Sequence, residues 1–146
     1  MNAEQTAALQ QALRAEHAVI WAYGEIGAHA APQRKDQIAE VELRHRQRRD
    51  ATEALIVKAG DPPDPSEPAY QLPKPVTNPT DAVQIAALIE DKVAAPWRYL
   101  LGHSNDVDVR NLAINSLIDA ATQALTWRRV TAGDQATTQA FPGAGA

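Results

Sequence analysis

Four stretches of the chain repeat apolar residues with the period of an α-helix. The spacing predicts helices over residues of about 3–30, 32–59, 81–101 and 108–132. Asn2 with Gln5 three residues later resembles a capping box for the first helix, and Gly60 suits the C-terminal cap of the second. Thr80 and Asp81 are expected to cap the third. The pattern therefore predicts an all-α chain.

A proline-rich connector separates the second predicted helix from the third. Residues 60–80 hold seven of the ten prolines, a composition that disfavours helix and suits extended backbone. At about 3.1 Å per residue such a segment can reach roughly 65 Å, enough to run the length of a bundle. The third helix can then run parallel to the second, which gives two antiparallel hairpins joined by a long crossover, the ferritin-like topology. Because a long linker can also double back, an up-down-up-down bundle is the alternative.

The predicted four-helix bundle comprises residues 1–132, and single residues within it allow more specific predictions. Pro96 lies inside the third predicted helix and is expected to kink or end it, since proline lacks an amide donor. Trp97 belongs to the predicted core, whereas Trp21 points away from the inward stripe and is a candidate for contact with the connector or a second copy. Residues 133–146 are rich in Gly and Ala and are predicted to form a loose tail.

Composition narrows the classes of function. Fourteen Lys and Arg against eighteen Asp and Glu give a net charge of −4, which disfavours a basic polyanion binder or membrane clamp. The arginines at 44, 46, 48 and 49 scatter around their helix among acidic residues, so a nucleic-acid patch is also disfavoured. The lack of Cys excludes disulfides and thiolate metal sites. Without a signal-peptide pattern or a transmembrane run, we expect a cytoplasmic protein.

Polar residues interrupt the apolar faces of three predicted helices near their midpoints. Glu16 lies at the centre of the first inward face and Glu90 at the centre of the third. The second helix carries between its apolar ends the residues Glu42, His45, Arg48, Arg49 and Thr52. An antiparallel bundle gathers these side chains at one level of the interior, where isolated carboxylates are costly. They therefore require protons, a cationic side chain or a metal ion.

The acidic positions resemble a known ligand pattern. Glu16, Glu42 with His45 three residues later, and Glu90 look like the Glu, Glu-x-x-His and Glu ligands of ferritin-like di-metal carboxylate proteins. The chain also resembles an actinobacterial ferritin-like domain family of unknown function. The matching features are Glu16-His17-Ala18 with Tyr23-Gly24, the run from His45 to Asp50, the connector and Ala140-Phe141-Pro142-Gly143. This resemblance implies a ferritin-like bundle with Glu16, Glu42, His45 and Glu90 as candidate ligands of Fe, Mn or Zn.

The fourth predicted helix departs from the di-metal pattern. Its inward face consists of Ala113, Leu117, Ala120, Ala121 and Ala124, without a second Glu-x-x-His, and Asp119 is assigned to the polar face. Ferritin-type ferroxidase chemistry is therefore not expected. One metal ion held by Glu16, Glu42 and His45 is the first alternative. In the second, favoured here, Arg48 and Arg49 pair with the carboxylates in a metal-free network that includes Thr52.

These observations favour one function and leave others open. The favoured hypothesis is a non-catalytic bundle that dimerises or binds a protein partner, with Trp21 and the proline-rich connector as leads. The competing hypothesis is a protein that binds one Fe, Mn or Zn ion, or an oxidoreductase built on that site. A nucleic-acid adaptor is a third and weaker hypothesis. The sequence names no substrate.

Overall fold

The protein is a bundle of four long helices. The structure, a computed structural model, describes residues 1–144, so the last two residues of the predicted tail lie outside the described part. Helix α1 spans Ala3–His29, α2 spans Lys35–Lys58, α3 spans Pro79–His103 and α4 spans Val107–Ala132, with short 3-10 turns at Pro32–Arg34 and Gly133–Gln135. The predicted all-α fold is confirmed.

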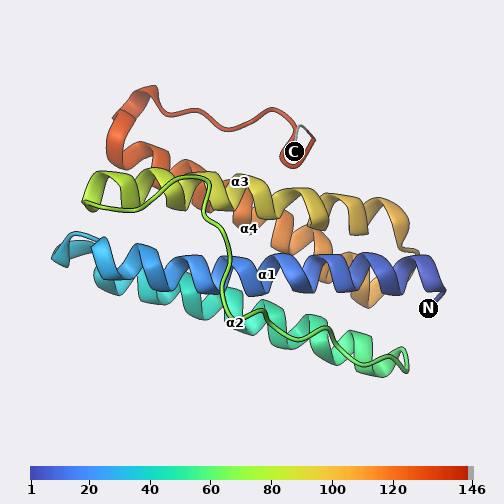
Figure 1. Cartoon of the computed structure of the whole chain (residues 1–146). Helices are drawn as coiled ribbons and strands as arrows, with labels where there is room; N and C mark the ends of the chain where they lie inside the picture. The colour runs from blue at the N-terminus through green and yellow to red at the C-terminus, as the bar shows by residue number, and fades with distance from the viewer. Residues whose placement is uncertain (145–146) are drawn as a thin grey trace.

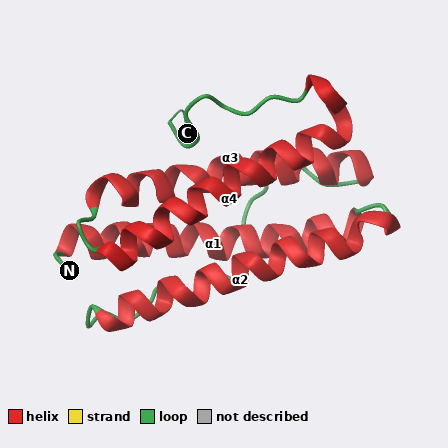
Figure 2. Ribbon diagram, turned by 180° about the vertical axis from the view of Figure 1, so that it is seen from behind, coloured by secondary structure: helices red, strands yellow, loops and turns green. Residues whose placement is uncertain are grey.

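The connector determines the topology. Helices α1 and α2 form one antiparallel hairpin and α3 and α4 the other (Figure 1). The connector leaves the end of α2, returns along the bundle and delivers the chain to the same end at which α2 begins, so α3 runs parallel to α2 (Figures 1 and 2). The long-crossover arrangement is therefore the one adopted, rather than the up-down-up-down alternative.

Local sequence signals account for the helix ends. The capping box at Asn2 and Gln5 is present, with hydrogen bonds of 2.8 and 3.1 Å between each side chain and the backbone amide of the other residue. Gly60 follows α2 with φ of +93°, a value that favours glycine. The predicted cap of α3 is wrong: Asn78 caps the helix because Pro79 already suits its first position, and the predicted cap residue Asp81 accepts hydrogen bonds from Thr77 instead.

Helix α3 does not end at Pro96. It continues to His103, although proline removes one helical hydrogen bond, the one to the carbonyl of Lys92. Trp97 and Leu100, just beyond the proline, are fully buried. Burial of these two large side chains stabilises the last turns by several kcal/mol at about 25 cal/mol per Å² of apolar area, which offsets the lost bond.

The four helices are not equally packed. Helix α1 packs against both α2 and α3, and α3 packs closely against α4, whereas α2 and α4 touch much less. Polar side chains join these last two helices: Arg44 Nη2 donates to Gln123 Oε1 at 2.6 Å, and Lys58 Nζ to Asp108 Oδ2 at 3.1 Å. The apolar core therefore lies mainly among α1, α3 and α4, and α2 covers it with a narrow face.

The segment after α4 folds back over the bundle. It runs along α3 toward the opposite end of the molecule (Figures 1 and 2). Gly143 has φ of +76°, and a Cβ atom there would lie 2.7 Å from the carbonyl oxygen of Ala94, so only glycine allows this close approach. Among residues 1–144, no helix combines the length and the apolar character needed to cross a membrane.

Candidate functional site

A buried histidine joins carboxylates from two other helices at the centre of the bundle. His45 of α2 places Nδ1 at 2.7 Å from Glu16 Oε2 of α1, and Nε2 at 3.0 Å from Glu90 Oε1 of α3. All three side chains are at most 1% exposed. The predicted convergence of Glu16, His45 and Glu90 is therefore present, and the imidazole occupies the space between the two carboxylates.

Helices α1 and α3 also exchange hydrogen bonds crosswise. Trp97 of α3 donates Nε1–H to Glu16 Oε1 at 2.7 Å, while Tyr23 of α1 donates its hydroxyl to Glu90 Oε1 at 2.5 Å. Each donor lies seven residues after the glutamate of its own helix, and seven residues make about two helical turns. Because α1 and α3 are antiparallel, the same spacing on both helices brings each donor level with the other helix's carboxylate.

Tyr23 connects this pair to the fourth helix. Its hydroxyl accepts a hydrogen bond of 2.9 Å from Trp127 Nε1 of α4, and its ring stacks on the His45 imidazole with centroids 5.4 Å apart. Both Tyr23 and Trp127 are fully buried. The polar atoms of these large side chains are thus satisfied inside the core, as their burial requires.

An arginine links the network to the surface between α2 and α4. Arg48 Nη1 lies 3.3 Å from Glu16 Oε1, and Nη2 donates to Asp119. Asp119, predicted on the polar face of the fourth helix, is indeed partly exposed, but it also pairs with Arg48. Its side chain is 39% exposed, yet it holds the outer end of a guanidinium that is itself buried. The loose α2–α4 contact leaves room for the long arginine side chain.

The surroundings change the pKa values of His45, Glu16 and Tyr23. Burial alone would lower the pKa of His45, but the charges of Glu16 and Glu90 and their hydrogen bonds raise it to about 9. Burial alone would raise the pKa of Glu16, but His45, Arg48 and the Trp97 hydrogen bond together lower it. Burial and the Glu90 carboxylate raise the pKa of the Tyr23 hydroxyl. At neutral pH the centre therefore contains an imidazolium held between two acceptors.

Two predicted site residues lie outside this network. The Glu42 side chain is partly exposed and bonds to Arg46 of the next turn at 2.6 Å, while Arg49 bonds to its neighbour Asp50. Helix α2 buries one narrow stripe, which comprises Ile38, Val41, His45, Arg48, Thr52 and Ile56. Glu42 is about 60° from His45 around the helix axis, on the side opposite Arg48, and so falls beside the stripe. The remaining predicted member, Thr52, is buried and donates to the Arg48 carbonyl at 2.7 Å.

The donor atoms do not fit the metal ion that the ferritin-like resemblance implies. Both nitrogens of His45 face carboxylate oxygens, and Arg48 places a cation beside Glu16, where a metal would otherwise supply the positive charge. Within residues 1–144, no group of three or more His, Asp or Glu side chains is arranged to hold a metal. Among the residues that the structure describes, Glu90 Oε2 has no hydrogen-bond partner, but a single oxygen falls short of the four ligands of a zinc site.

Four members of the network were not identified as polar partners from the sequence. From the sequence, Trp97 is predicted only as a core residue, Tyr23 enters through the family resemblance, and Asp119 is placed on the polar face. Trp127 carries no prediction. The available signal is the seven-residue spacing of Tyr23 from Glu16 and of Trp97 from Glu90, since donors two turns away share the face of their glutamate.

Comparisons with known proteins agree with this fold. Over residues 8–146 the chain matches the family described as "Domain of unknown function (DUF4439)". A similar solved structure is that of a conserved hypothetical protein, rv2844, from Mycobacterium tuberculosis, which is 32% identical and superimposes with a TM-score of 0.85 over 89% of this chain and 98% of that chain. A search of curated proteins finds no match. The chain therefore belongs to the DUF4439 family.

Proposed function

We propose that this protein is a non-catalytic helical bundle that acts by binding a protein partner, and that its buried Glu–His–Arg network is structural. The claim that the bundle is non-catalytic rests on His45, whose two ring nitrogens both bond to buried glutamates. A general base or a metal ligand needs a nitrogen lone pair free to face its target. An imidazolium enclosed in this way has none to offer.

A cleft on the surface supports partner binding. It has a volume of about 800 Å³ and lies between α1, α2 and the connector. Trp21 lines it, half-buried, and packs against Tyr70 of the connector with ring centroids 6.1 Å apart. Aromatic side chains that are only partly covered are typical anchors of protein interfaces. The expected contact between Trp21 and the connector is therefore part of the proposed binding surface.

The charge of the cleft favours a basic partner. Two arginines line it, Arg46 and Arg49, and both already bond to neighbouring carboxylates. Five carboxylates also line it, those of Glu25, Glu42, Glu53, Asp64 and Glu67. Glu42 pairs with Arg46 and Asp64 with Arg14, so the charge that favours a basic partner comes from Glu25, Glu53 and Glu67. Complementary charge raises the association rate and selects the partner. The charge favours another protein with a basic segment, and the expected homodimer, in which a second copy of this acidic chain is the partner, is the alternative.

Metal analysis tests the non-catalytic part. The protein is purified without chelators, supplied separately with Fe, Mn and Zn, and analysed for bound metal by mass spectrometry. We expect no stoichiometric metal in the wild type. Stoichiometric metal that is lost on Glu16→Leu but kept in a surface control, Glu4→Leu, would establish the alternative of a single-metal or oxidoreductase site and overturn the proposal.

Association measurements test the partner-binding part. Sedimentation velocity over a wide concentration range reports dimerisation, and titration with a Lys- and Arg-rich peptide reports binding of a basic segment. Trp21→Ala is expected to weaken whichever association occurs by about 30-fold, the loss typical of an interface hot spot. Tyr99→Ala changes an exposed aromatic outside the cleft and should have no effect. Absence of both associations, or equal effects of the two variants, would refute the proposal.

A further inference from the structure

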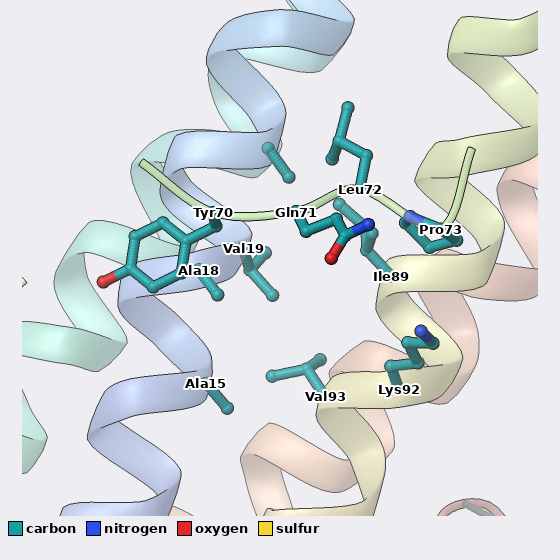
Figure 3. Close-up of a pocket in the computed structure, with 11 residues that line it drawn as sticks. Ala15, Ala18, Val19, Tyr70, Gln71, Leu72, Pro73, Ile89, Lys92 and Val93 are labelled. Carbon is teal, nitrogen blue, oxygen red and sulfur yellow. The ribbon is translucent and has the colours of Figure 1, made fainter. Parts of the chain in front are cut away.

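A second hollow lies on another side of α1, between α1 and α3. Its volume is about 150 Å³, and the connector covers it with residues 70–73 (Figure 3). Ala15, Ala18 and Ala22 of α1 form one wall, and Ile89 and Val93 of α3 form the other. Leu72 of the connector also lines it. This cavity is separate from the buried network and, apart from a shared Tyr70, from the cleft on the other side of the connector.

The cavity follows from the side chains that face it. The three alanines recur at intervals of three and four residues, so they lie on one strip of α1 and leave a space that larger residues would fill. The walls are aliphatic, and the volume between them is close to that of apolar cavities that accept a molecule the size of benzene. The chemistry of the walls therefore favours an apolar guest.

Two polar groups lie at the margin. In Figure 3 the side chains of Lys92 and Gln71 extend beside the cavity, from α3 and from the connector respectively. Lys92 is exposed, and it forms no ion pair with any carboxylate in the described part of the chain, residues 1–144. A ligand with an anionic end can thus bond to the ammonium group while its apolar part is buried.

Among the described residues, the connector segment directly above the cavity, residues 70–73, is held by side-chain packing and not by hydrogen bonds of its own backbone. Within the described residues, no backbone–backbone hydrogen bond involves positions 62–77. Side chains of α1 hold its first part, where Gln10 and His17 bond to backbone atoms of residues 62 and 64. Arg14 also pairs with Asp64. Over the cavity itself, the connector is held by the packing of Tyr70 on Trp21 and of Leu72 on the core. Residues 70–73 can therefore open at a lower free-energy cost than the helices, which gives a ligand a route between α1 and α3.

We propose that this cavity binds a small amphipathic carboxylate. Its apolar part, of about six to eight carbon atoms, lies between α1 and α3, and its carboxylate bonds to Lys92. The site goes beyond the proposed partner-binding function, because it uses a different surface and a different class of ligand. Pockets of this kind typically combine an apolar lining with a few polar groups that orient the ligand.

Calorimetric titration of the full chain with octanoate tests the proposal, with 1-octanol as the neutral counterpart. We expect saturable binding of one octanoate per chain. Ala18→Leu fills the cavity and should weaken binding of both compounds at least tenfold, whereas Ala28→Leu, on the exposed face of the same helix, should leave it unchanged. If Ala18→Leu does not fold by circular dichroism, Ala15→Val makes the same test with a smaller side chain.

Charge substitutions test the orientation of the ligand. Lys92→Gln should weaken octanoate binding by about two- to fivefold, the size of an exposed ion pair, and leave octanol binding unchanged. Lys35→Gln, at the start of α2, is the matched control. Absence of saturable binding, or octanoate binding that Ala18→Leu leaves intact, would overturn the site. An equal effect of Lys92→Gln on both compounds would overturn the proposed position of the carboxylate.

Discussion

The substitution Glu16→Gln should destabilise the protein severely. It preserves the shape of the side chain but removes the negative charge to which Trp97, His45 and Arg48 all donate. The new amide group also turns a hydrogen-bond donor toward one of these donors. Breaking a buried ion pair by removing one partner costs about 3–5 kcal/mol. Because a domain of this size has a total stability of about 5–15 kcal/mol, we expect a large fraction of it to be lost.

Glu42→Gln provides the matched comparison. Glu42 is also a glutamate within the predicted ligand set, but its partly exposed side chain bonds to Arg46 one turn away. Such pairs contribute about 0.3–0.5 kcal/mol, so the variant should unfold almost like the wild type. The assay is urea unfolding at pH 7, followed by far-UV circular dichroism at one protein concentration. A loss of less than about 1 kcal/mol for Glu16→Gln, or equal losses for both variants, would refute a structural network centred on Glu16.

Other residues give further tests. The pKa of His45 rises from 6.5 to about 9 on folding, so its stabilising charge is fully present below pH 6.5 and is lost as pH rises through 9. The free energy of unfolding should fall by about 3 kcal/mol across that interval, and a flat urea-unfolding profile in wild type would contradict this. Tyr23→Phe leaves Trp127 Nε1 unpaired and should cost about 1–3 kcal/mol in urea unfolding, more than the exposed control Tyr99→Phe. Gly143→Ala should displace the tail from α3 and speed its cleavage in limited proteolysis, and unchanged cleavage would refute that contact.

The sequence determined the fold more completely than the site. Apolar periodicity, the Asn2 capping box and the proline content of the connector predicted four helices, and the reach of the connector allowed the observed topology. Each of these signals depends on a few neighbouring residues, so it can be recognised from the sequence without knowing how the helices pack. The end of α3 was less predictable, because the penalty at Pro96 is local whereas the burial of Trp97 that offsets it depends on packing with other helices.

The central residues of the network were predictable because local periodicity places them, whereas Glu42 and Asp119 at its edge were not. Glu16 and Glu90 each lie in the middle of an apolar stripe, so their burial followed from periodicity alone. Whether the Glu42 side chain is buried depends on how wide a face α2 buries, and the weak contact with α4 keeps that face narrow. Asp119 depended on the reach of Arg48 across that same contact. Neither the width of the buried face of α2 nor the reach of Arg48 to α4 can be predicted from the sequence of one helix alone.

The crosswise bonds between α1 and α3 have a consequence for tolerated changes in length. Inserting one residue between Glu16 and Tyr23 would turn the tyrosine by about 100° around the axis, away from Glu90, and slipping one helix past the other by a turn would break both bonds together. The same holds for the interval from Glu90 to Trp97. We therefore expect insertions or deletions within these two intervals to disrupt the fold, whereas the connector can take a change in length without shifting α1 against α3.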